Sequence, residues 1–140
     1  MHNLDKIRAS LSGYTLLITG GGSGIGYSTA KLFAKMGANV AVNYLPEDIE
    51  SKNRVNELKD KYINIIEVTG DVSQEKIAKR VIFETIKKFN SLNSLINNVG
   101  IGLVKDPIPF KELDQLNNDF WQKIMSVNVM SAFYLSLIHI

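Results

Sequence analysis

Residues 15–26 read TLLITGGGSGIG, in which an apolar run leads into a cluster of glycines. Beyond the cluster, apolar side chains recur at helical spacing as far as Gly37, a residue typical of a helix end. Strand, glycine turn and helix in this order form the front of a βαβ unit, where the backbone approaches a phosphate closely and the positive end of the helix dipole faces its charge. A plain flexible loop is the other interpretation. The predicted pyrophosphate-binding residues are Gly20, Gly22, Ser23, Gly24, Ile25 and Gly26.

The rest of the chain alternates short apolar runs with amphipathic stretches, which is the pattern of an α/β protein with a parallel sheet. We predict further strands at residues 40–42, 64–68 and 92–97, helices at 46–61 and 73–89, a long loop at 101–118 and a last helix from about residue 119. Pro46 suits the first turn of its helix, and Ser73 suits the cap of the next one.

The composition argues against several classes of function. The 140 residues carry a net charge of +2 with no dense basic block, which argues against binding to nucleic acid or to an anionic membrane surface. There is no cysteine, and His2 and His139 are the only histidines, so neither a disulfide framework nor a metal centre is expected. The sequence shows neither a signal peptide nor a membrane-spanning run, and we expect a cytoplasmic location.

Three further motifs follow the glycine turn: Asp71–Val72 after the third predicted strand, NNVG at 97–100 after the fourth, and Asn128 in the last helix. Together with TGGGSGIG at 19–26, they resemble the short-chain dehydrogenases/reductases over residues 13–134, whose motifs are TGxxxGIG and NNAG. Val99 departs from the usual alanine. The resemblance implies a Rossmann-like, doubly wound parallel sheet in three α/β/α layers, here with about four strands. It implies that Asp71 and Val72 bind the adenine and that Asn98 and Gly100 lie along the cofactor. It further implies that Asn128 belongs to a catalytic proton relay.

The resemblance also implies an activity. Members of the family transfer a hydride between NAD(P)H and a carbonyl or secondary alcohol, using a serine and a Tyr-x-x-x-Lys motif that do not follow Asn128 here. We therefore expect a homo-oligomeric parent enzyme with a small-molecule substrate, and a fragment that binds cofactor without turnover. Tyr27 and Lys31 have the Tyr-x-x-x-Lys spacing, but they directly follow the pyrophosphate turn, so we reject them as the catalytic pair. A non-catalytic sensor or scaffold that binds the dinucleotide is the alternative.

The dinucleotide-binding domain is predicted to span residues 1–134. Residues 135–140, LSLIHI, resemble the translation of an adapter used to prepare sequencing libraries, and we interpret them as a non-native read-through tail. An ordinary apolar helix end is the other interpretation.

The choice between NAD and NADP depends on the end of the second strand, where an acid would accept a hydrogen bond from the ribose 2′-hydroxyl and repel a 2′-phosphate. Tyr44 occupies this position, so the sequence favours NADP over NAD. Against this, Ser23 replaces the basic residue that many NADP-binding relatives carry in the glycine turn. Glu47 and Asp48 lie close by and oppose a phosphate, unless they only complement the dipole of the helix that they open.

Overall fold

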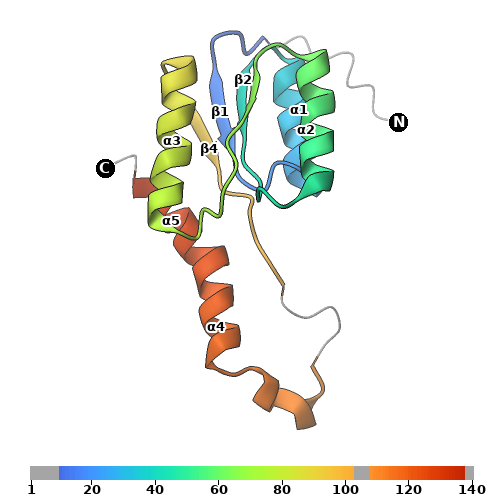
Figure 1. Cartoon of the computed structure of the whole chain (residues 1–140), viewed down its shortest axis with the longest axis vertical. Coiled ribbons are helices and arrows are strands. Elements are labelled where there is room, and N and C mark those ends of the chain that lie inside the picture. Colours follow the sequence, from blue (N-terminus) through green and yellow to red (C-terminus); the bar gives the residue numbers. More distant parts are fainter. Residues whose placement is uncertain (1–9, 103–107, 138–140) are drawn as a thin grey trace.

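The computed structural model describes residues 10–102 and 108–137, with a parallel sheet at its centre (Figure 1). The strands are β1 (Thr15–Ile18), β2 (Asn39–Val42), β3 (Ile65–Glu67) and β4 (Ser94–Ile96). Their order in the sheet is β3-β2-β1-β4 and every neighbouring pair is parallel, with Leu17 opposite Ala41 on one side and Leu95 on the other. The predicted α/β class with a parallel sheet is confirmed.

Helices cover both faces of this sheet. They are α1 (Gly24–Lys35), α2 (Ile49–Lys61), α3 (Glu75–Phe89), α4 (Asn118–Met125) and α5 (Ser131–Ser136), with a 3₁₀ helix η2 (Phe110–Gln115) and a π-helical turn η3 (Ser126–Met130). Helices α1 and α2 lie on one face, and α3 and α5 on the other (Figure 1). Because successive strand residues face opposite sides, Leu16 packs with Val55 of α2 in a first core cluster, and Leu17 packs with Val81 of α3 in a second. The predicted three layers are therefore present.

Helix α2 begins three residues later than predicted. Its first residue is Ile49 and not Pro46, because the carboxylate of Asp48 accepts a hydrogen bond from Ser51 N at 2.9 Å and caps the helix there. Pro46 therefore belongs to the loop that leaves β2.

Helix α3 also begins differently. It starts at Glu75, and Ser73 does not cap it, because the Ser73 hydroxyl donates to Asp71 Oδ1 at 2.7 Å instead. The hydrogen bond from Ser73 to Asp71 has therefore replaced the expected cap of α3.

The predicted loop at 101–118 contains η2, while residues 103–107 lie outside the described part of the chain.

The C-terminal part of the chain, residues 110–137, forms a helical arm that leaves the sheet (Figure 1). Its end is anchored, because α5 packs against α3 and Leu135 is fully buried in the second core cluster. Helix α4, in contrast, contains no buried residue. The large apolar side chains of the arm that stay between 45% and 52% exposed are Trp121, Met125, Val129 and Phe133.

The predicted domain boundary after residue 134 falls inside α5. Leu135 is buried, and Ser136 Oγ lies 3.4 Å from Asn97 Nδ2. The interpretation of residues 135–140 as a tail stays a prediction, and residues 138–140 lie outside the described ranges. None of the described helices is long and apolar enough to cross a bilayer.

Candidate functional site

A cleft of about 290 Å³ lies at the carboxyl ends of the strands, the edge at which open parallel sheets bind their ligands. The glycine turn, the loop after β2, the turn after β3 and the segment after β4 all contribute to it, and the arm adds residues from α4 and η3. The lining residues are Gly20, Gly22, Ser23, Asn43, Tyr44, Leu45, Asp48, Ser51, Gly70, Asp71, Val72, Ser73, Val99, Gly100, Ile101, Lys123 and Val127.

The glycine turn is held against the end of β4 by two side chains. Asn98 Nδ2 donates to Thr19 O at 3.0 Å and to Gly20 O at 3.1 Å. Thr19 Oγ1 accepts from the backbone N–H groups of Asn98 and Val99, each at 3.1 Å. A Cβ at Gly26 would lie 2.3 Å from Gly20 O and 2.6 Å from Asn98 Nδ2, so this position admits no side chain unless the turn moves. Asn98 and Gly26 therefore set the shape of the turn.

The first turn of α1 carries unpaired hydrogen-bond donors. Ser23 precedes the helix, and its side chain makes no capping hydrogen bond. Within the described residues, no acceptor takes the backbone N–H groups of residues 23–26. These donors lie at the positive end of the helix dipole, which is the arrangement that suits the oxygens of a pyrophosphate.

Asn43, at the end of β2, joins the two sides of the cleft. Its side chain is buried and donates to Gly70 O at 3.1 Å, while its backbone oxygen accepts from Gly21 N at 2.9 Å. Gly70 N in turn donates to Tyr44 O at 2.9 Å. The end of β2 therefore lies between the glycine turn and the turn that carries Asp71.

Asp71 presents a fixed carboxylate to the cleft. Its Oδ1 accepts from Ser73 N at 3.0 Å and from Ser73 Oγ at 2.7 Å. Burial alone would raise the pKa of Asp71, but the hydrogen bonds from Ser73 and the positive charge of Lys123 outweigh it and hold the pKa below its usual value. An ionised carboxylate is an acceptor only, which suits it to the exocyclic amine of adenine.

Tyr44 lines the cleft without a free polar group at its tip. The side chain is 5% exposed, and its hydroxyl donates to Glu67 Oε2 of β3. Burial, together with this contact to a carboxylate, raises the pKa of Tyr44 well above its usual value. The hydroxyl bond in turn lowers the pKa of Glu67, which Lys59 also contacts at 3.2 Å. Tyr44 is therefore a neutral, hydrogen-bonded wall of the cleft.

Asn128 lies in the middle of η3 and connects the arm to the chain after β4. Its Oδ1 accepts from Ile101 N at 2.7 Å, and its Nδ2 donates to Ile101 O at 2.9 Å. A Cβ at Gly100 would lie 3.4 Å from Asn128 Oδ1, so Asn128 borders the cleft beside two residues that line it. π-Helical turns occur frequently at functional sites. The proton-relay role assigned to Asn128 stays a prediction.

The structure brings most of the predicted cofactor residues together. Those that line the cleft are Gly20, Gly22, Ser23, Tyr44, Asp71, Val72 and Gly100. Those that do not line it are Gly24, Ile25, Gly26, Asn98 and Asn128. Tyr27 and Lys31 do not line it either, and Tyr27 packs against the first core cluster. Whether these residues contact a cofactor stays a prediction.

Several lining residues were missed by sequence reasoning. They are Asn43, Leu45, Ser51, Gly70, Ser73, Ile101, Lys123 and Val127. Val99 was named only as part of the NNVG motif, and Asp48 only as a charge near the end of the second strand. Most of them follow a parallel strand within a few residues. Residues in such positions lie at the carboxyl edge of the sheet, so the sequence could have indicated that they line the cleft. Lys123 and Val127 carried none, because they come from the arm.

Comparison with known proteins gives one consistent result. A family model for the short chain dehydrogenases matches residues 14–139. An uncharacterized oxidoreductase of Thermotoga maritima is 34% identical over 127 residues, which are 91% of this chain and 47% of that relative. The chain thus spans about half the length of the curated relatives that it matches.

Two solved structures extend the likeness to three dimensions. A 3-ketoacyl-(acyl-carrier-protein) reductase from Brucella melitensis, complexed with NADH, has a TM-score of 0.80 at 29% identity, over 94% of this chain and 50% of its own. A short chain dehydrogenase from Burkholderia cenocepacia, in complex with NADP, has a TM-score of 0.79 at 28% identity, over 91% of this chain and 49% of its own. One of these structures holds NADH and the other NADP.

Proposed function

The chain belongs to the short-chain dehydrogenase family, and from this membership we propose that it is the cofactor-binding part of an NAD(P)-dependent oxidoreductase. The observation that carries the proposal is the cleft, which is lined by Ser23, where the unpaired N–H groups of the first turn of α1 begin, and by Asp71 with its fixed carboxylate. Donors suit the pyrophosphate and an acceptor suits the adenine amine, so the residues present fit an adenine dinucleotide.

The bound cofactor would supply the nicotinamide that gives or takes a hydride at the carbon of a small carbonyl compound or secondary alcohol. The chain's own residues fix the adenosine and pyrophosphate half. Asn98 and Thr19 hold the glycine turn in its shape, and Asn128 holds the segment after β4 beside the cleft. Each of these groups is already bonded to the backbone, so the turn is preorganised for its ligand.

The 140-residue chain itself is expected to bind the dinucleotide without turnover. Transfer of a hydride to a carbonyl leaves negative charge on the oxygen, and a positioned proton donor is needed to neutralise it. No Tyr-x-x-x-Lys follows Asn128, and Tyr27, which has the right spacing to Lys31, does not line the cleft. An experiment should therefore find that the chain binds the dinucleotide but does not reduce or oxidise a substrate with it.

The preference for NADP that Tyr44 predicts requires that no other carboxylate lies near the 2′-phosphate of the ribose. Asp48 lines the same cleft and opposes that preference. The proposed ligand is therefore a nicotinamide adenine dinucleotide, either NAD or NADP.

The test is calorimetric titration of the chain with NADH and with NADPH, for the wild type, Gly26→Ala and Ser28→Ala. A methyl group at Gly26 would force the glycine turn to move, so we expect Gly26→Ala to weaken binding by at least about tenfold. Ser28 is exposed on the same helix, and Ser28→Ala should bind like the wild type. Absorbance of the reduced nicotinamide, followed with a panel of ketones and alcohols, should show no turnover. A wild type that binds neither dinucleotide would refute the proposal.

A further inference from the structure

Asp48 brings a carboxylate to the cleft from the loop that follows β2. The end of β2 is hydrogen-bonded to the glycine turn on one side and to the turn before Asp71 on the other, at 2.9 Å in both cases. A dinucleotide with its pyrophosphate on the glycine turn and its adenine beside Asp71 would therefore have its adenosine ribose near the residues that follow Tyr44. Among these, Leu45 and Asp48 line the cleft.

This carboxylate is ionised and held in place. Its Oδ1 accepts from Ser51 N at 2.9 Å and its Oδ2 from Ser51 Oγ at 2.6 Å. These two bonds hold the pKa of Asp48 below its usual value. Ser51 is fixed against the glycine turn, because a Cβ at Gly22 would lie 2.2 Å from the Ser51 Cβ. The charge of Asp48 therefore sits at the junction of α2 with the pyrophosphate-binding turn.

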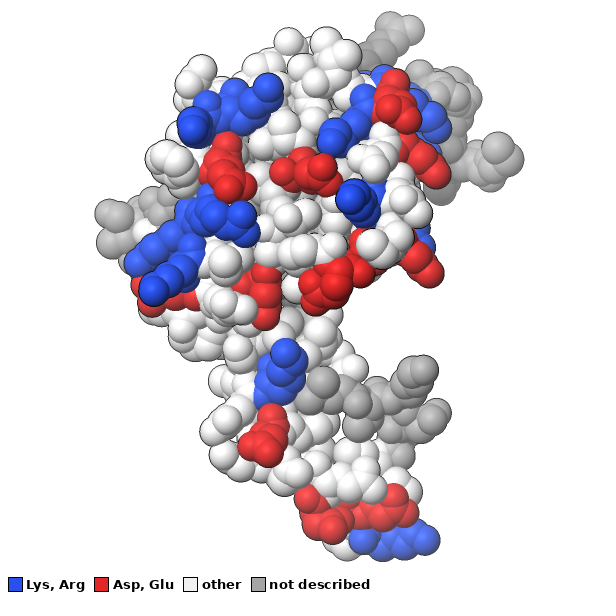
Figure 2. All heavy atoms as spheres, in the orientation of Figure 1, with Lys and Arg blue, Asp and Glu red and all other residues white. Residues whose placement is uncertain are grey.

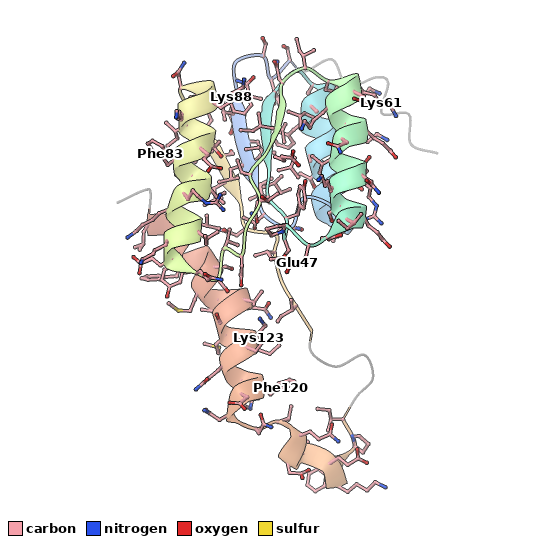
Figure 3. All side chains as sticks on the ribbon, in the orientation of Figure 1. Glu47, Lys61, Phe83, Lys88, Phe120 and Lys123 are labelled. Carbon is pink, nitrogen blue, oxygen red and sulfur yellow. The ribbon has the colours of Figure 1, made fainter. Side chains whose placement is uncertain are left out.

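Arg54 is the cation whose charge acts on Asp48 and helps to lower the pKa of that carboxyl, but it does so from outside the cleft. Arg54 extends to Glu50 at 2.8 Å and to Gly22 O at 3.3 Å, and it does not line the cleft. Lys123 does line it, and its charge helps to lower the pKa of Asp71. Figure 3 shows Lys123 on α4, away from the sheet. Figure 2 shows acidic side chains gathered along the edge of the sheet-bearing part that faces the arm.

We infer that Asp48 is the residue by which this chain distinguishes the two dinucleotides, so that it binds NAD in preference to NADP. A 2′-phosphate would bring a second negative charge against the fixed, half-buried carboxylate, and the two like charges would repel. A ribose with a free 2′-hydroxyl instead has a hydrogen to donate to it. The inference rests on the proposed function and reverses the preference for NADP that Tyr44 predicts.

The experiment compares NAD⁺ with NADP⁺ by calorimetric titration at one constant ionic strength, for the wild type, Asp48→Asn and Glu47→Gln. Asparagine keeps a side-chain oxygen that can cap α2, so Asp48→Asn removes the charge and retains the cap. Glu47→Gln removes a neighbouring charge that does not line the cleft and serves as the matched control. Circular dichroism of each variant checks that the fold is retained.

We expect the wild type to bind NAD⁺ at least about tenfold more tightly than NADP⁺, Asp48→Asn to reduce this ratio to within about threefold, and Glu47→Gln to leave it unchanged. A wild type that binds both dinucleotides but prefers NADP⁺, or an Asp48→Asn ratio equal to that of the wild type, would overturn the inference while the proposed function stands. A wild type that binds neither would overturn both. The wild-type ratio requires no variant, so the inference is tested even if Asp48→Asn does not fold.

Discussion

The sheet-bearing part of the molecule, residues 10–101, and the helical arm, residues 110–137, differ in how they are held. In the sheet-bearing part, each apolar strand residue packs into one of two core clusters, and Leu16, Leu17 and Ile18 have no exposed surface. In the arm, α4 buries none of its residues, and among the described residues only α5 reaches a core cluster, through Leu135 and the partly buried Tyr134. The arm extends away from the sheet in Figure 1.

This difference separates two parts of the candidate site. The donors at the start of α1, the Asp48 carboxylate and the Asp71 turn all belong to the sheet-bearing part and are fixed by its core. The arm adds Lys123 and Val127 to the cleft and Asn128 to its border. We therefore expect the glycine turn, Asp48 and the Asp71 turn to depend on the stability of the sheet, and the arm to modify the cleft that they form.

The largest effect is expected from a substitution in the sheet. Leu17→Ala removes a fully buried side chain from the second core cluster and should lower the free energy of unfolding by about 2–5 kcal/mol, because it loses transfer free energy and leaves a cavity. Trp121→Ala in the arm, where the side chain is half exposed, should cost less than about 1 kcal/mol. Urea unfolding monitored by far-ultraviolet circular dichroism measures both. Equal losses would show that the arm is as tightly integrated as the sheet.

An intermediate effect is expected where the two parts are connected. Asn128→Ala removes both hydrogen bonds to Ile101 and should cost about 1–2 kcal/mol, as each net hydrogen bond contributes about 0.5–1.5 kcal/mol. Hydrogen exchange of the Ile101 amide should accelerate, while that of the Leu17 amide in β1 should stay slow. Gln122→Ala, at an exposed position of α4, is the control. Unchanged exchange at Ile101 would mean that the connection does not depend on Asn128.

The two parts of the molecule also differ in how far their structure follows from the sequence. Strands buried on both faces are continuous apolar runs, and a glycine cluster between a strand and a helix indicates a tight turn, so the sheet and the glycine turn were predictable. The start of α2 was not, because Pro46, Glu47 and Asp48 all suit a helix start and only the bond from Ser51 N selects Asp48. The prediction that Ser73 caps α3 was wrong for a similar reason, because its hydroxyl donates to Asp71 Oδ1 instead.

The arm was less predictable because tertiary contacts determine its path. The π-helical turn at Ser126–Met130 interrupts the helical period and leaves no signature in an apolar pattern. The bond pair between Asn128 and Ile101 joins residues 27 positions apart, and this contact sets where Lys123 meets the cleft. Local propensity carries no information on such a contact.

The smallest effect tests the electrostatic link between the two parts. The positive charge of Lys123 helps to lower the pKa of Asp71, so Lys123→Gln should raise that pKa. A carboxylate whose pKa is depressed in the folded state contributes stability above its unfolded pKa of about 3.9, and loses that contribution as pH falls through the folded value. The variant should therefore be less stable than the wild type at pH 7. The difference in the free energy of unfolding should be less than about 0.5 kcal/mol, because Lys123 is exposed and solvent screens its charge. At acid pH, where Asp71 is protonated in both proteins, the two should be equally stable. The measurement is a carbon NMR titration of the Asp71 carboxyl with urea unfolding at neutral and acid pH, and Lys111→Gln, exposed on η2, is the control. An Asp71 pKa that does not rise in Lys123→Gln would mean that the arm does not hold its charge over the cleft in solution.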